Sequence, residues 1–134
     1  MILLVEDEER YREIFANMLK KAGYGVVEAT DGLEALSLLE QLPCDLVVSD
    51  ILMPKLNGYA LVARIRAKWP NMPIILTSGY LPQDAAKTIL NGSVEFISKP
   101  FDAAALIAIV QRLIRPPSSM QTTAAQKYGD RAAK

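Results

Sequence analysis

Short apolar runs alternate, along residues 1–115, with segments in which apolar residues recur at helical spacing. The runs are rich in Ile, Val and Leu and are bounded by turn-forming residues, which predicts β-strands. They cover residues 2–5, 25–29, 45–50, 73–76 and 94–98. Because strands and helices alternate with short loops, we predict a doubly wound α/β sandwich around a five-stranded parallel sheet, in the strand order 2-1-3-4-5.

The helical segments carry signals of different strength. Gly23 is placed to end the first helix, and Asp31 and Glu34 have the spacing of a capping box for the second. The segment 81–90 has few apolar residues, so a helix there should be the loosest element of the fold. Asp102 is placed to cap a last helix that runs to about residue 114. The side chains expected to face the core are Tyr11, Ile14, Phe15, Met18, Leu19, Ala22, Ala35, Leu36, Leu39, Leu42, Leu61, Val62, Ile65, Leu106, Val110 and Leu113.

The composition is typical of one globular domain, with 51% hydrophobic and 22% charged residues in a chain of 134. Lys plus Arg equal Asp plus Glu at 15 each, so no overall field would attract nucleic acid or an anionic membrane. Arg64, Arg66 and Lys68 are interpreted as solvated. We find neither a membrane span nor a signal peptide, and expect a cytoplasmic protein. Residues 116–134 have few large apolar side chains, which predicts a linker or disordered tail after a domain at 1–115.

Histidine is absent, and Cys44 is the only cysteine. These two facts exclude Ser-His-Asp and Cys-His catalysis, an internal disulfide and a cysteine-based metal site. Cys44 is interpreted as a small buried apolar residue. Any chemistry must therefore come from carboxylates, hydroxyls and amines.

An acidic residue, Asp50, ends the third and most apolar strand, where an ionised side chain is costly unless it is paired. The predicted strand order brings Glu6, Asp7, Thr77 and Lys99 to the same edge of the sheet. Clustered carboxylates repel unless a cation lies among them, and hard oxygen ligands suit Mg²⁺. With Lys99 to neutralise the remaining charge, Asp50 is placed to attack phosphorus. The expected product is an aspartyl phosphate.

Four motifs surround these residues: Val-Glu-Asp-Glu at Asp7, Asp-Ile-Leu-Met-Pro at Asp50 with Gly58 shortly after it, Leu-Thr-Ser at Thr77, and Phe-Ile-Ser-Lys-Pro-Phe at Lys99. With them, residues 2 to about 115 resemble a response-regulator receiver domain of two-component signalling. The resemblance implies a flavodoxin-like sandwich and a regulatory domain rather than an enzyme. Asp50 would accept a phosphoryl group from the phosphohistidine of a histidine kinase or phosphotransfer protein.

The resemblance also implies roles for the neighbouring residues. Thr77 and Lys99 would hold the phosphoryl oxygens, and Thr77 with Phe96 would form a switch. A Mg²⁺ ion would be held by Glu6, Asp7, Asp50 and the backbone carbonyl of Leu52.

The chain departs from the family pattern at a few positions near the phosphate. Ser78 stands where alanine is frequent, and Phe96 has no hydroxyl, so a switch there must be steric. Neither Leu52 nor Gly79 has a side chain that would orient a hydrolytic water. We therefore expect slow autodephosphorylation.

The surface made by the fourth helix, the fifth strand and the last helix is expected to carry the signal. With Leu106, Val110 and Leu113 against the sheet, the outer face of the last helix has no acid. It suits a second copy of the chain in a two-fold dimer, or an output partner. That face consists of Ala104, Ala105, Ala108, Gln111 and Arg112, with Ile107 and Ile109 at its margins.

Other readings of the sequence stay open. A degenerate receiver would keep the fold as a phosphate-independent interaction module. A flavin-binding protein of the same topology would need a phosphate loop where Glu6 to Glu9 stand, and a Mg²⁺ phosphohydrolase would need a second acid after Asp50. The resemblance fits a single-domain regulator as well as the receiver part of a longer regulator or hybrid kinase.

Overall fold

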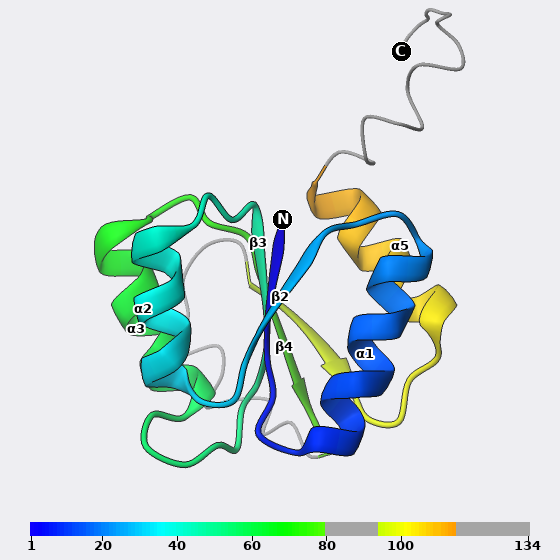
Figure 1. The fold of residues 1–134 in the computed structure, drawn as a ribbon, viewed down its shortest axis with the longest axis horizontal. Coiled ribbons are helices and arrows are strands. Elements are labelled where there is room, and N and C mark those ends of the chain that lie inside the picture. Colours follow the sequence, from blue (N-terminus) through cyan, green and yellow to red (C-terminus); the bar gives the residue numbers. More distant parts are fainter. Residues whose placement is uncertain (80–93, 115–134) are drawn as a thin grey trace, which may run out of the picture.

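The computed structural model describes residues 1–79 and 94–114 as a central sheet with helices on both faces (Figure 1). The strands are β1 (Ile2–Val5), β2 (Val26–Ala29), β3 (Leu46–Asp50), β4 (Ile74–Ser78) and β5 (Val94–Ser98). The helices are α1 (Glu9–Lys21), α2 (Gly32–Gln41), α3 (Gly58–Lys68) and α5 (Ala103–Leu113). The fourth predicted helix, at 81–90, and the tail at 116–134 lie outside the described residues, so the domain boundary near 115 stays a prediction.

The five strands are parallel and lie in the order β2-β1-β3-β4-β5, which confirms the predicted fold. The register places Val5 beside Ser49 and Asp50 beside Thr77. One edge of the sheet therefore carries the residues at the ends of β3 and β4, together with those that directly follow β1 and β5.

Alternate strand residues supply two separate cores, because successive side chains point to opposite faces. Leu4 of β1 belongs to the cluster that includes Phe15 of α1 and Leu106 of α5. Leu3 belongs to the other cluster, with Leu61 of α3. Figure 1 shows α1 and α5 on one face of the sheet, with α2 and α3 on the other. Strand β3 is buried along its whole length, as its continuous apolar run predicts.

Two of the side chains predicted to face the core are exposed. Tyr11 and Ile14 of α1 retain 38% and 42% of their accessible surface. Helical spacing assigned them to the buried stripe, but α1 turns its buried face to the sheet through Phe15, Ala16 and Leu19.

The interpretation of Arg66 as merely solvated was also wrong. Its Nη1 donates to the carbonyl of Met72, on the loop before β4, at 2.6 Å.

The helix ends follow the local sequence signals. Gly23 has a φ of 99° just after α1, a conformation that glycine adopts without the steric penalty of a Cβ. Asp31 is the N-cap of α2 and accepts from the backbone N of Glu34 at 2.8 Å. Glu34 accepts in return from the backbone N of Thr30 at 2.7 Å, one residue earlier than a standard capping box. Asp102 caps α5 as predicted, by accepting from the backbone N of Ala105.

Candidate functional site

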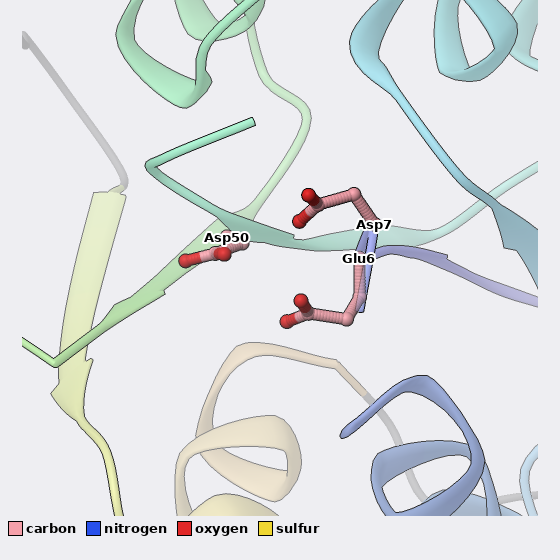
Figure 2. A group of neighbouring side chains, drawn as sticks. All are labelled: Glu6, Asp7 and Asp50. Carbon is pink, nitrogen blue, oxygen red and sulfur yellow. The ribbon is translucent and has the colours of Figure 1, made fainter. Parts of the chain in front are cut away.

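Three acids converge at the carboxyl edge of the sheet. Glu6 and Asp7 directly follow β1, and Asp50 is the last residue of β3. Each offers a carboxylate oxygen, and these three atoms lie within 4.8 Å of one another. Figure 2 shows the side chains of Glu6 and Asp7 leaving the end of β1 with their carboxylates extending toward the side on which Asp50 lies. The sequence-based expectation that these acids meet is thus fulfilled.

Burial makes this group of acids unusual. Glu6 is 1% exposed and Asp50 8%, whereas Asp7 lies at the surface. Burial is the main cause that raises the pKa of Glu6 above its usual value, with further repulsion from Asp50. Burial likewise raises the pKa of Asp50, and the charge of Asp7 adds to the rise. Ionising the site is therefore costly without additional positive charge.

Lys99, which follows β5, supplies one cation for the two buried acids. Its Nζ lies 3.0 Å from Oε1 of Glu6 and 3.4 Å from Oδ2 of Asp50, with only 11% of the side chain exposed. These contacts oppose the rise in the pKa of both acids. The ammonium also lies 4.4 Å from the centre of the Tyr11 ring, a favourable cation–π contact. The exposed position of Tyr11 thus has a physical reason, which helical periodicity could not indicate.

The main chain fixes the orientation of the Asp50 carboxylate. The backbone N of Ile51 donates to Oδ1 of Asp50 at 2.8 Å and also to the carbonyl of Thr77 at 3.0 Å. Oδ2 faces Lys99. The two oxygens therefore have different partners. Oδ1 is held by the backbone, and Oδ2 contacts Lys99, the only cationic side chain that pairs with Asp50 among the described residues.

The donor set fits a hard divalent cation. The group supplies carboxylate oxygens only, and Asp7 is exposed, which leaves access for water, as Mg²⁺ requires. One ammonium balances two buried carboxylates only in part, so a further cation would relieve the remaining repulsion. Leu52, whose carbonyl is the fourth expected ligand, follows Ile51 and is 72% exposed.

The two expected switch residues lie on neighbouring strands. Thr77 is buried at 1% exposure and pairs in register with Asp50. Phe96 is half-buried on β5, where Leu76 is its register partner, and packs against the core under α2 and α3. Ser78 is buried beside Thr77, whereas Gly79 is exposed.

Sequence reasoning missed the contacts that shape the loop after β3. Gly58 appeared only as part of a motif, yet an ideal Cβ there would lie 2.6 Å from the carbonyl oxygen of Asp50. Lys55 had no assigned role, yet its Nζ lies 3.3 Å from Oδ2 of Asp31. The hydrogen bond from Glu34, helped by Lys55, lowers the pKa of Asp31. No local signal links residues 31 and 55, because the loops that carry them meet only in the folded chain.

Comparison with models of protein families shows to which family the chain belongs. The family model of the response regulator receiver domain matches residues 2–111. The chain belongs to this family. Receiver domains are regulatory domains of two-component systems, act in phosphorylation-dependent signalling, interact with histidine kinases and bind Mg²⁺ in an acidic site.

Two curated relatives are longer proteins that contain a segment similar to this chain. The response regulator protein FleR of Pseudomonas aeruginosa is 34% identical over 112 residues, which are 83% of this chain and 24% of that protein. The sensor kinase CckA of Brucella abortus is 35% identical over 116 residues, 84% of this chain and 12% of that protein. The chain thus spans a quarter or less of these two relatives.

Solved structures of receiver domains have a similar fold. The receiver domain of NtrX from Brucella abortus has a TM-score of 0.78 at 32% identity, over 84% of this chain and 97% of that one. The receiver domain of the sensor histidine kinase PA1611 from Pseudomonas aeruginosa has a TM-score of 0.75 at 32% identity, over 84% and 94%. That structure has a magnesium ion coordinated in its active site cleft. Among the described residues of the present chain, no helix is long and apolar enough to cross a membrane.

Proposed function

We propose that Asp50 is the phosphoacceptor of a signalling switch, and that it takes a phosphoryl group from the phosphohistidine of a partner histidine kinase or phosphotransfer protein. The observation that carries this proposal is the Asp50 carboxylate itself. It is buried at the sheet edge, held by Ile51, and lies beside Lys99 and two further acids. A carboxylate that is oriented by the backbone is pre-positioned for attack, which lowers the entropic part of the barrier.

The proposed transfer exchanges one bond to phosphorus for another. An oxygen of Asp50 forms a bond to phosphorus while the bond between phosphorus and the donor imidazole nitrogen breaks, and the imidazole leaves with that electron pair. Thr77 and Lys99 would hold the phosphoryl oxygens. Glu6, Asp7, Asp50 and the Leu52 carbonyl would hold Mg²⁺, which when bound neutralises charge on the transferring oxygens. The chain itself would act as a substrate and switch rather than as an enzyme with turnover.

The test is phosphorylation by acetyl phosphate with Mg²⁺, followed by intact-mass analysis. We expect the parent chain to gain one phosphoryl group and Asp50→Asn to gain none, because an amide is not a nucleophile of comparable strength. If the folded parent gains no phosphoryl group, the alternative of a degenerate receiver that acts as an interaction module replaces this proposal. A phosphoryl group on Asp50→Asn would instead move the acceptor elsewhere.

Millimolar Mg²⁺ should raise the melting temperature of the unphosphorylated chain. A ligand that binds only the native state stabilises it by mass action, by roughly 1.4 kcal/mol at ten times the dissociation constant. Asp7→Asn should lose most of this gain, since it removes one of the three carboxylates that meet at the site. Thermal unfolding with and without Mg²⁺ measures both effects, and an unchanged melting temperature of the parent would show that the metal assignment is wrong.

The phosphoryl group on Asp50 should be long-lived. Hydrolysis requires a water oriented in line with the phosphorus–oxygen bond, and neither the exposed Leu52 nor Gly79 offers a polar side chain for that purpose. The measurement is the decay of the phosphorylated mass after removal of acetyl phosphate. Decay within seconds, without an added phosphatase, would contradict this expectation.

The outer face of α5 is our proposed output surface, together with β5 and the segment at 81–90. Leu106 and Val110 are buried as expected. The outward residues are exposed, and they are Ala104, Ala105, Ala108, Gln111 and Arg112. We expect activation by beryllofluoride and Mg²⁺ to increase the sedimenting mass through a two-fold dimer or a bound partner, and Ala108→Glu to prevent the increase, because it places a charge in a face of small side chains. An unchanged mass of the activated parent, together with normal partner binding by Ala108→Glu, would place the output surface elsewhere.

A further inference from the structure

Two loops lie against each other beside the acidic site. One is the β2–α2 loop (residues 30–31), and the other is the β3–α3 loop (residues 51–57), which contains Leu52. Gly32, the first residue of α2, makes their approach possible. An ideal Cβ on Gly32 would lie 2.7 Å from the carbonyl oxygen of Leu56 and 2.8 Å from its Cβ, both closer than real contacts allow. The β3–α3 loop is therefore seated directly on the first turn of α2.

Asp31 joins the two loops through both of its oxygens. Oδ1 accepts from the backbone N of Glu34 at 2.8 Å and so caps α2. Oδ2 lies 3.3 Å from Nζ of Lys55, in the middle of the β3–α3 loop. Only 11% of the Asp31 side chain is exposed, against 62% of the Lys55 side chain. The rigid partner is thus the capping aspartate, and the loop is attached to it.

The backbone of the β3–α3 loop needs such an attachment. Lys55 has a φ of 69°, in the left-handed region that residues other than glycine seldom adopt. On its C-terminal side the backbone N of Leu56 donates to the carbonyl of Pro54 at 2.7 Å, and Gly58 N donates to the carbonyl of Ile51 at 2.8 Å. The loop is closed at its base by Gly58 and attached at its tip by Lys55. Leu52 lies in the part of the loop between Ile51, which accepts the hydrogen bond from Gly58, and Lys55.

We infer that Asp31 and Lys55 are positioning residues for the metal site, because their ion pair holds the loop that carries the Leu52 carbonyl. This inference rests on the proposed function, in which that carbonyl is a ligand of Mg²⁺. Residues that orient a ligand without touching the metal commonly tune metal affinity. The Asp31–Lys55 pair holds the loop that contains Leu52. Neither residue is one of the three acids Glu6, Asp7 and Asp50.

The direction of the effect separates positioning from simple electrostatics. Removing the positive charge of Lys55 near a Mg²⁺ site would by Coulomb's law alone tighten Mg²⁺ binding. If the ion pair positions the loop, Lys55→Ala should instead weaken binding, by about threefold to fivefold, since exposed ion pairs are weak. Lys55→Arg, which keeps the pair, should restore most of the affinity.

The test is calorimetric titration of Mg²⁺ into the parent and into matched variants. Lys55→Gly is expected to bind Mg²⁺ as weakly as Lys55→Ala. Glycine removes the strain of the positive φ at this position but cannot form the ion pair with Asp31. Lys68→Ala is the charge control, since Lys68 pairs with Glu40 between α2 and α3 outside this loop. Glu34→Ala is the capping control, since it removes the acceptor for Thr30 and leaves Asp31 with Lys55. Both controls should bind Mg²⁺ as the parent does.

Hydrogen exchange gives a readout that does not depend on the metal. In Lys55→Ala the amides of Leu56 and Gly58 should exchange faster while amides of the sheet are unchanged, whereas a general loss of stability would raise exchange throughout. Affinity that is unchanged or tighter in Lys55→Ala would overturn the positioning role while leaving the metal site intact. A parent that binds no Mg²⁺ would overturn the metal site, and this inference with it.

Discussion

Lys99→Met should lower the free energy of unfolding by about 3 kcal/mol near neutral pH, because removing one member of a buried ion pair leaves the other charge without compensation. Lys99 contacts both Glu6, which is 1% exposed, and Asp50, which is 8% exposed. The variant would leave two buried carboxylates facing each other without a cation. Denaturant unfolding at equilibrium measures the loss. Lys68→Met is the matched control, because it breaks an exposed lysine pair with Glu40, and it should change the free energy of unfolding by less than about 1 kcal/mol.

The loss in Lys99→Met should depend on pH in a defined direction. The pKa values of Glu6 and Asp50 are raised above their usual 4.5 and 3.8. An acid with a raised pKa binds its proton more tightly in the folded state, and this proton binding stabilises the fold. The stabilisation is fully present below the pKa of the unfolded state and is lost as the pH rises through the pKa of the folded state. Lys99 opposes the rise, so the pKa values should be still higher in the variant. The difference in unfolding free energy between parent and variant should therefore shrink as the pH falls from neutral toward the usual pKa values of these two acids. A difference that stays constant over this range would show that the loss comes from packing rather than from charge.

Gly58→Ala should destabilise the fold by about 3 kcal/mol, at the upper end of the cost of overpacking. The new Cβ would lie 2.6 Å from the carbonyl oxygen of Asp50, the last residue of β3, and 2.8 Å from Cα of Ile51, the residue that follows it. Both are backbone atoms. The clash would also strain the 2.8 Å hydrogen bond from Gly58 N to the Ile51 carbonyl. Because the displaced residues include Asp50, we expect phosphorylation by acetyl phosphate to slow together with the loss of stability.

Gly25→Ala is the control for this prediction. Its ideal Cβ would meet only the flexible end of Met1, at 3.7 Å, and the chain there does not have a positive φ. The same substitution should thus leave stability unchanged or raise it slightly, since alanine reduces the entropy of the unfolded chain. Equal effects of the two substitutions in denaturant unfolding would contradict the steric argument at Gly58.

The elements of this fold could be predicted because their signals are local. The apolar run at 45–50 identified β3, and the strand at 94–98 was predicted with its observed bounds. The capping roles of Asp31 and Asp102 followed from residue type and spacing. The acids at the site could be grouped in advance for a related reason, since parallel strands place their carboxyl ends at one edge once the strand order is known.

Only the tertiary structure decided which side chains meet across distant segments. Helical periodicity predicted Tyr11 as a core residue, but its ring lies at the surface over Lys99, 88 positions later in the chain. The sequence identified Asp31 as a cap without indicating that its second oxygen pairs with Lys55. Periodicity and capping describe interactions within a few residues, whereas these contacts depend on how two loops are seated on the same sheet edge. The sequence by itself determined the strands, the helices that the structure describes and the acids of the site. Long-range packing decided how those acids are paired and which loop is held beside them.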